Sequence, residues 1–278
     1  MKITLEMIKE LRKKTQAGIT YCKKALEETQ GDVDSAVDIL KKKGLFYYKP
    51  DKKDTLQGLT NVIVNKNKAI LYELNTETDF VTQNKNFIEL YNEVGQILLE
   101  ADFYVKILSD FLKYKWNGRT VEEIISQKAF IIKEQIVLSR IQIVYKKDQE
   151  GFGFYKHQGG KISSLVHLSN SSADAEEHLP VHVVAMKPKF LNKDLVDIKF
   201  VNQEKENLLE QIKQKNTNKP LNDTTLEKIA VNNLKALIEK NCFLEQPFYM
   251  DFNQKVSEYL KQNNTNIIAY YCFEVGKR

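Results

Sequence analysis

The feature that most constrains the fold is an order of predicted elements that occurs twice along the chain: two strands and then a helix. Residues 59–64 and 69–74 alternate between apolar and polar side chains, as half-buried strands do, and a helical pattern follows them. The residues between the two strands, 65–68, have the composition of a hairpin turn. Strands and a helix return in the same order in segment 153–186. This repetition predicts an α+β protein with two related halves.

The first half contains further predicted elements after its strand pair. A polar loop at 75–84 leads to a helix whose apolar positions begin at Phe87. A second helix is predicted from Thr120 towards Leu138, and a strand at 141–145. We therefore expect one core subdomain over residues 57–146.

The second half is expected to span residues 147–278. A turn at Gly159-Gly160 separates its two strands, and its helix runs from about Ala173 to Met186. Residues 194–240 are richer in Lys, Glu and Asn, with sparse apolar positions on two helical segments and a bend predicted at 218–220. This pattern is typical of a protruding helical hairpin with a thin apolar seam.

The N-terminal 48 residues have a different pattern of apolar residues, with helical periodicity. Apolar residues recur at helical spacing in three short stretches, and Gly18 and Gly31 interrupt them. This predicts a separate three-helix domain over residues 1–48. Residues 49–56 are charged, contain Pro50 and lack periodicity, so they are expected to form a linker.

Composition places the chain among ordinary globular proteins. Its 278 residues include 42 Lys and Arg against 37 Asp and Glu, a net charge of +5. The basic residues are spread along the chain without interleaved aromatic residues, which is typical of a solvated surface, although a basic RNA- or ribosome-binding accessory protein stays open as an alternative. Three scattered cysteines, the lack of a secretory signal and the lack of a long apolar run predict a soluble cytoplasmic protein with no membrane partner.

Sequence motifs for catalysis or cofactor binding are missing. There is no GxxxxGK[ST] phosphate loop and no GxSxG nucleophile motif. His178 and His182 are four residues apart, but they lack an HExxH context and Pro180 lies between them, so a surface position or a position at the start of a helix is favoured over a zinc site. We therefore expect neither an enzyme nor a bound cofactor or metal.

Two segments are unusual for their local context. In the first, Phe80 and Val81 lie inside an otherwise polar loop that follows a strand. One interpretation is that the aromatic ring folds back into the core. The other is that Asp79 and Phe80 form an acidic and aromatic tip for a partner, because a Phe side chain carries about 150–250 Å² of surface that an interface can bury.

The second unusual segment is 11–26, which is basic and contains Gly18 between two helical stretches. A helix-turn-helix core with solvated lysines explains this pattern without any partner.

Six segments, taken in order, resemble the elongation factor Ts family. They are LRKKTQAGITYCKKAL at 11–26, TDFV at 78–81, YKHQGGKI at 155–162, KPKFL at 187–191, QPF at 246–248 and FEVG at 273–276. Each segment alone is weakly specific, but together they extend over nearly the whole chain. The chain departs from the family pattern at Tyr21, where aspartate is usual, and at Ser163, where glycine is usual.

This resemblance implies both a fold and a function. Residues 1–48 correspond to the ubiquitin-associated-like domain of the family, and the two α+β halves and the helical hairpin correspond to its core. The family binds the guanine-nucleotide domain of elongation factor Tu, disturbs Mg²⁺ coordination there and so releases GDP. The implied partner is thus a translational GTPase, with no direct nucleic-acid partner.

The resemblance also implies which residues act. Asp79 and Phe80 are inserted between two helices of the partner, and Thr78 and Val81 shape that segment. Further contacts are implied for the N-terminal domain and for one strand end in the core. These residues are Arg12, Gly18, Ile19, Thr20 and His157.

Overall fold

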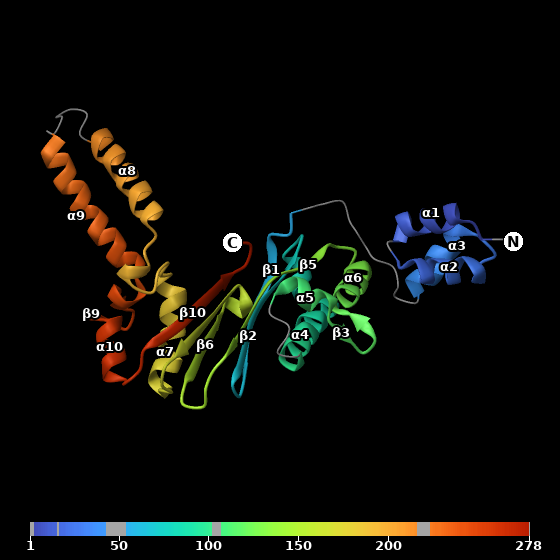
Figure 1. Cartoon of the computed structure of the whole chain (residues 1–278), viewed down its shortest axis with the longest axis horizontal. Coiled ribbons are helices and arrows are strands. Elements are labelled where there is room, and N and C mark those ends of the chain that lie inside the picture. Colours follow the sequence, from blue (N-terminus) through green and yellow to red (C-terminus); the bar gives the residue numbers. More distant parts are fainter. Residues whose placement is uncertain (1–2, 16, 43–53, 102–106, 216–222, 278) are drawn as a thin grey trace. The chain divides into compact units, whose positions relative to one another are not determined.

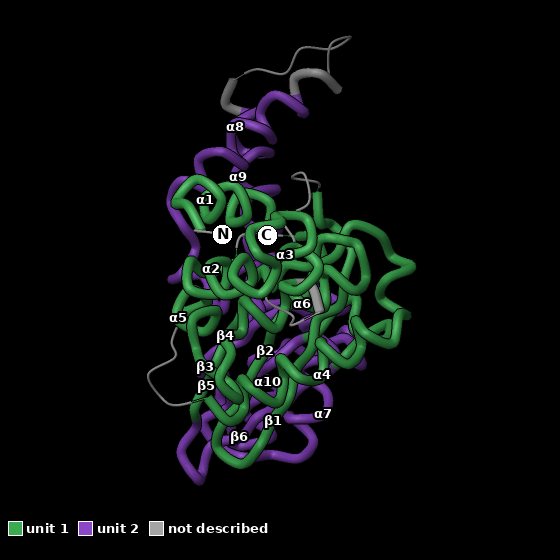
Figure 2. Tube along the Cα trace, turned by 90° about the vertical axis from the view of Figure 1, so that its right-hand side faces the viewer, with its two compact units in different colours: residues 1–145, 156–163, 273–278 green, residues 146–155, 164–272 purple. Residues whose placement is uncertain are grey.

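The computed structural model describes residues 3–277 except 16, 43–53, 102–106 and 216–222. By their internal contacts the residues form two compact units, which Figure 2 distinguishes by colour. Unit 1 comprises 1–145, 156–163 and 273–278, and unit 2 comprises 146–155 and 164–272. The predicted division into domains 1–48, 57–146 and 147–278 stays a proposal, and most of the predicted linker at 49–56 lies outside the described residues. None of the helices in the described part of the chain combines the length and the apolar character that a membrane span requires.

The N-terminal region contains the three predicted helices. They are α1 (Leu5–Thr15), α2 (Ile19–Glu28) and α3 (Val33–Lys42). Their apolar faces meet in a small cluster in which Leu11, Leu26 and Leu40 are almost fully buried. Gly31 has a φ of 93°, and its N–H donates to the carbonyl of Leu26 at 2.8 Å, so it ends α2 as a left-handed cap.

The first sheet is antiparallel and has three strands in the order β1-β2-β5. They are β1 (Gln57–Asn65), β2 (Lys68–Thr76) and β5 (Ile136–Tyr145). The predicted hairpin is confirmed, because Asn65 pairs with Lys68 across a two-residue connection in which Lys66 has a φ of 52°.

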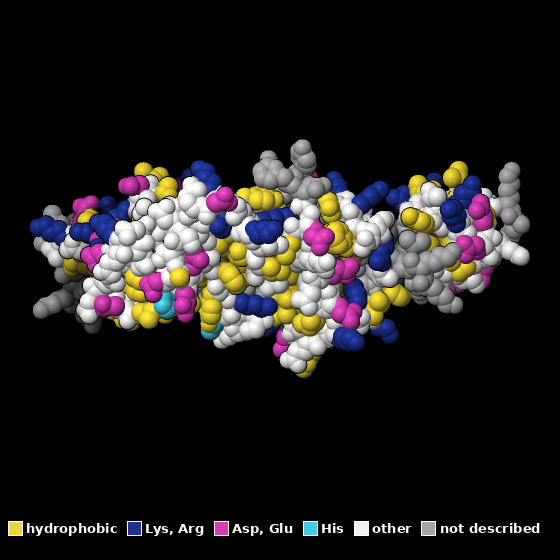
Figure 3. All heavy atoms as spheres, turned by 90° about the horizontal axis from the view of Figure 1, so that it is seen from below, with side chains coloured by type: hydrophobic (Ala, Val, Ile, Leu, Met, Phe, Trp, Pro, Cys, Tyr) yellow, Lys and Arg dark blue, Asp and Glu magenta, His cyan; other side chains and the backbone are white. Residues whose placement is uncertain are grey.

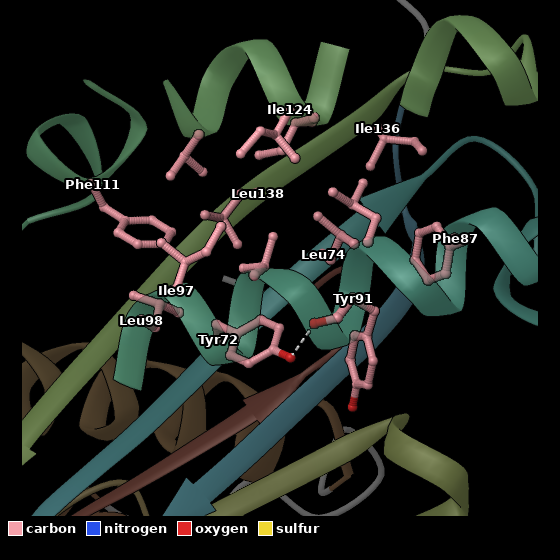
Figure 4. Close-up of a cluster of buried hydrophobic side chains, with 14 of the residues drawn as sticks. Tyr72, Leu74, Phe87, Tyr91, Ile97, Leu98, Phe111, Ile124, Ile136 and Leu138 are labelled. Carbon is pink, nitrogen blue, oxygen red and sulfur yellow. Dashed lines mark hydrogen bonds between the residues drawn. The ribbon is translucent and has the colours of Figure 1, made fainter. Parts of the chain in front are cut away.

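Helices pack against this sheet and complete the first core. They are α4 (Lys85–Glu100), α5 (Leu108–Lys113) and α6 (Val121–Ile132), and the short strands β3 (Lys115–Trp116) and β4 (Arg119–Thr120) form a small hairpin before α6. Figure 4 shows Phe87 and Phe111 among the buried side chains of this cluster. The hydroxyl of Tyr72 donates to the carbonyl of Tyr91 at 2.6 Å and so satisfies a polar group inside the core.

The prediction that Thr120 begins a helix is confirmed, because Thr120 is the N-cap of α6, but the predicted extension of that helix towards Leu138 is wrong. Helix α6 ends at Ile132, because Lys133 takes a left-handed conformation (φ 64°) and caps it. Strand β5 then begins at Ile136, five residues earlier than the predicted strand, and Ile136 and Leu138 point into the core at strand spacing. The apolar run 136–138 fits both helical and strand periodicity, and it forms a strand because it pairs with β2.

The second sheet repeats this topology, with the order β10-β7-β6. Its strands are β6 (Gly151–His157), β7 (Ile162–Leu168) and β10 (Ile267–Glu274), and the 3₁₀ turn η2 (Gln158–Gly160) joins the first two. Gly159 and Gly160 have φ values of 65° and 106°, as a tight turn requires. In both sheets the second strand of a hairpin is central, and a strand from later in the chain pairs with its other edge. The repeated order predicted from sequence is thus confirmed.

The second core lies between this sheet and its helices. The elements are α7 (Ala173–Met186), the 3₁₀ turns η3 (Lys193–Leu195) and η4 (Phe243–Glu245), strands β8 (Pro247–Phe248) and β9 (Asp251–Lys255), and α10 (Val256–Gln262). Leu179 and Val183 of α7 are fully buried against Phe243 and Phe248.

Two longer helices, α8 (Ile198–Lys215) and α9 (Asp223–Asn241), lie side by side in unit 2. Among the described side chains their contact is narrow, with Ile212, Leu226 and Ala230 as its buried apolar cluster. This agrees with the thin seam that the sequence predicts. The bend predicted at 218–220 lies outside the described residues.

Candidate functional site

The unusual segment after β2 forms an ordered surface loop, residues 77–84, which we call the Phe80 loop. It leaves the sheet after Thr76 and reaches α4 at Lys85, with the 3₁₀ turn η1 (Phe80–Gln83) inside it. The side chain of Phe80 is 84% exposed, whereas that of Val81 is only 6% exposed. The interpretation that Phe80 packs into the core is therefore wrong, and Val81 alone of the two belongs to the core cluster.

Local hydrogen bonds hold the turn that presents Phe80. The carbonyl oxygen of Asp79 accepts from the backbone N–H of Thr82 at 3.0 Å and from its hydroxyl at 2.6 Å. The side chain of Asn84 accepts from the N–H of Asn86 at 2.9 Å and caps α4. The loop thus has a defined backbone although its tip carries an exposed aromatic ring.

Asp79 and Phe80 are consecutive and both exposed, so a carboxylate and an apolar ring share the tip. Thr78 is half-buried, because its hydroxyl and its N–H both bond to the carboxylate of Glu134 at 2.7 and 3.0 Å. The four residues singled out in this segment are thus brought together, two at the surface and two facing the protein. Within the described residues, no group of three or more His, Cys, Asp or Glu side chains has the arrangement of a metal site.

Sequence reasoning missed Glu134. It lies 56 residues after Thr78, in the connection between α6 and β5, and it also accepts from the hydroxyl of Thr76 at 3.1 Å. Only the pairing of β2 with β5 brings these positions together. No spacing or motif in the sequence marks Glu134.

The N-terminal residues for which the sequence predicts partner contacts all lie at the surface of the three-helix region. Arg12 is in the last turn of α1, Gly18 is the N-cap of α2, and Ile19 and Thr20 begin that helix. All four are exposed, and Ile19 presents 56% of its surface although it is apolar. A helix-turn-helix core does account for the buried faces, but it leaves Ile19 unexplained.

His157 ends β6 and is half-buried. Its segment is anchored within unit 1, because the hydroxyl of Thr60 donates to the carbonyl of Gly160 at 2.9 Å. The neighbouring Lys156 donates to the hydroxyl of Tyr91 at 2.6 Å, and partial burial lowers the pKa of Lys156.

The prediction that His178 and His182 lie at the surface or at the start of a helix is wrong for His182, which is fully buried and lies well past the first turn of α7. Its ring stacks on Phe243 and Phe248 at centroid distances of 5.2 and 5.9 Å. One ring nitrogen, Nε2, bonds to Gln246 Oε1 at 2.9 Å, and Nδ1 accepts from the N–H of Tyr249 at 3.3 Å. Both nitrogens of a neutral imidazole are satisfied, so His182 is a structural residue of α7.

Comparison with known proteins decides the family. A family described as "Elongation factor TS" matches residues 77–277. The chain belongs to the elongation factor Ts family. Proteins named elongation factor Ts from Aster yellows witches'-broom phytoplasma (strain AYWB) and Phytoplasma mali (strain AT) are 41% and 42% identical to this chain. Alignment with the first covers 99% of this chain and all of the relative, and alignment with the second covers all of both.

The similarity to elongation factor Ts proteins is not confined to one end of the chain. The relative from Phytoplasma australiense is 40% identical over the full length of both proteins. The family match begins at Glu77, the first residue of the Phe80 loop, and it includes β5 of the first sheet, the whole second sheet and the helix pair, whereas β1 and β2 precede it. The three-helix region lies outside that match but inside the alignments with the full-length relatives.

Proposed function

We propose that this chain binds elongation factor Tu in its GDP form and promotes release of GDP, so that GTP can bind. Membership of the elongation factor Ts family supports the exchange role. The observation that carries the proposed site is the exposure of Phe80 beside Asp79 on an ordered loop. An exposed aromatic side chain on a fixed backbone loses little conformational entropy when a partner buries it.

An exchange factor makes and breaks no covalent bond. It binds the nucleotide-free GTPase more tightly than the GDP-bound form, and by reciprocity GDP weakens binding of the factor by the same ratio. A thousandfold loss of GDP affinity corresponds to about 4 kcal/mol of differential contact. One buried aromatic anchor supplies about 2 kcal/mol of this, so the rest must come from other contacts and from the metal ion.

In this proposal the Phe80 loop acts on the Mg²⁺ of the GTPase, which belongs to the partner and its nucleotide. Proteins hold Mg²⁺ through few ligands, together with phosphate oxygens and water, in a strict octahedral geometry. Insertion of the Phe80 ring between structural elements of the GTPase would shift those ligands, and the Asp79 carboxylate would repel the phosphates. Val81 and Thr78 hold the loop to its own protein.

The remaining contacts are proposed for Arg12, Gly18, Ile19 and Thr20 in the three-helix region, and for His157 in the core. Exposure of the apolar side chain of Ile19 supports the first group. A partner surface divided over separate regions spreads the binding free energy beyond the single aromatic anchor.

Release of fluorescent GDP from elongation factor Tu in a stopped-flow instrument tests the proposal. The chain should accelerate release in a saturable manner, and the Phe80→Ala variant should accelerate it far less than the wild type. The control is Phe252→Ala, which removes another exposed Phe ring, 68% exposed on β9. Unchanged GDP release at saturating protein would refute the proposal.

The same preparation tests the alternative of a basic RNA-binding protein. On the face shown in Figure 3, Lys and Arg side chains are interspersed with Asp and Glu, which gives no single-sign stripe for a phosphate backbone. Tight RNA binding with a steep salt dependence, together with no effect on GDP release, would favour the alternative.

A further inference from the structure

The Phe80 loop is attached to the sheet at a point where the backbone ladder stops. The pairing of β2 with β5 ends at Thr76 and Ile136. Beyond it, the residues that would pair next are joined by side chains: Glu77 Oε1 accepts from the N–H of Gln135 at 2.9 Å, and Glu134 accepts from Thr78. The carboxylates of Glu77 and Glu134 thus connect the two chain segments at the two positions that follow the last backbone pair.

The Glu134 carboxylate receives three donors from the loop side. Its Oε2 atom accepts from the Thr76 hydroxyl at 3.1 Å and from the Thr78 N–H at 3.0 Å, and its Oε1 atom accepts from the Thr78 hydroxyl at 2.7 Å. Hydrogen bonds to an ionised carboxylate are roughly twice as strong as neutral ones. A carboxylate that accepts from both the backbone and the side chain of Thr78 fixes the position and the rotamer of that residue.

The position of Glu134 is itself set by the fold. Lys133 has a left-handed conformation that ends α6 and turns the chain towards β5, so Glu134 faces the first residues of the loop. On the other side of the tip, Val81 is packed in the core and Thr82 bonds to Asp79. Phe80 therefore lies between two fixed points, Thr78 and Val81.

We propose that Glu134 is a positioning residue that orients the tip of the Phe80 loop for the GTPase by holding Thr78 from the opposite strand connection. This inference rests on the proposed function. Without Glu134 the ring of Phe80 stays exposed, but the loop that carries it samples more orientations. Ordering the loop then has to occur during the encounter with the partner, which lowers the rate of exchange within the complex.

The test compares Glu134→Ala and Glu134→Gln with the control Glu122→Ala, which removes the same charge from an exposed position on α6. Hydrogen exchange of the Thr78 amide and stopped-flow release of fluorescent GDP are measured for each protein. In Glu134→Ala we expect exchange of the Thr78 amide to be about tenfold faster and the maximal rate of GDP release about tenfold lower, each corresponding to about 1.4 kcal/mol. Glu134→Gln should lie between, because its amide nitrogen cannot accept a hydrogen bond.

Two outcomes would overturn the inference: a Thr78 amide in Glu134→Ala as protected as in Glu122→Ala, or faster amide exchange with unchanged kinetics of GDP release. Thr78→Val removes only the hydroxyl donor and keeps the shape of the side chain, so it replaces Glu134→Ala if that variant does not fold. A wild-type chain that fails to accelerate GDP release would refute the proposed function, while the amide measurement would still report on the connection itself.

Discussion

The two sheets have the same topology, but the connections that follow their central strands differ. In the first half, eight residues (77–84) lead from β2 to α4, and in the second half four residues (169–172) lead from β7 to α7. In the shorter connection, the N–H of Asn170 donates to the hydroxyl of Thr265 and the N–H of Ser171 donates to the carbonyl of Gln149. The longer one carries Asp79 and Phe80 at the surface.

The connection at 169–172 thus joins a strand to a helix, whereas the connection at 77–84 also presents a side chain at the surface. Asn84 caps α4 and Ser172 caps α7, so both connections start their helices in the same way. The additional residues of the first connection are not needed for that purpose. They form η1, which exposes Phe80 while Val81 joins the core.

The largest expected effect is a pH-dependent loss of stability in the second half, which contains the buried His182. Burial lowers the pKa of His182 to about 4, from an ordinary value of 6.5. As the pH falls from 6.5 to 4, the unfolded chain takes up a proton on this imidazole while the folded chain does not, so the free energy of unfolding falls. At pH 4 this loss amounts to about 3 kcal/mol. Urea unfolding at a series of pH values should show this loss, and His182→Gln should flatten the profile.

The second effect concerns the exposed tip of the first half. Phe80→Ala should slow GDP release from elongation factor Tu about thirtyfold, which corresponds to about 2 kcal/mol. Its melting temperature should equal that of the wild type, because the ring is 84% exposed. A melting temperature lowered by several degrees with exchange intact would show that Phe80 supports its own fold.

The neighbouring residue should behave in the opposite way. Val81→Ala removes two buried carbon atoms from the first core, so it should lower the free energy of unfolding by about 1.5 kcal/mol. Denaturant unfolding measures this cost. The contrast with Phe80→Ala is the informative result, since equal losses of stability in both variants would contradict the division of the pair between core and surface.

The smallest expected effect concerns the side-chain N-cap that ends each of the two connections. Asn84→Ala and Ser172→Ala each remove one N-cap acceptor and should each cost about 1 kcal/mol of stability. Thermal denaturation of the two variants measures this cost. GDP release should stay at the wild-type rate in Ser172→Ala, and a strong loss there would place the second connection at the partner surface as well.

Much of the fold could be predicted from local sequence patterns. The two-residue hairpin at Lys66-Asn67, the glycine turn at Gly159-Gly160 and the helix from Ala173 to Met186 all follow from short-range periodicity and turn chemistry. The end of α6 could not be predicted, because the apolar run 136–138 fits a helix or a strand until β2 pairs with it. Burial of His182 was missed since the rings that stack on it, Phe243 and Phe248, lie more than 60 residues further along the chain.

The candidate site divides in the same way. The sequence alone drew attention to Phe80 and Val81, because an aromatic and an aliphatic residue in a polar loop after a strand are locally anomalous, and the family resemblance set the limits 78–81. Only the tertiary structure decided that Phe80 faces solvent, that Val81 faces the core, and that Glu134 holds Thr78. The reason is physical: periodicity records which face of an element is apolar, but burial of one particular ring and pairing of one particular carboxylate depend on residues that the chain brings together from far apart.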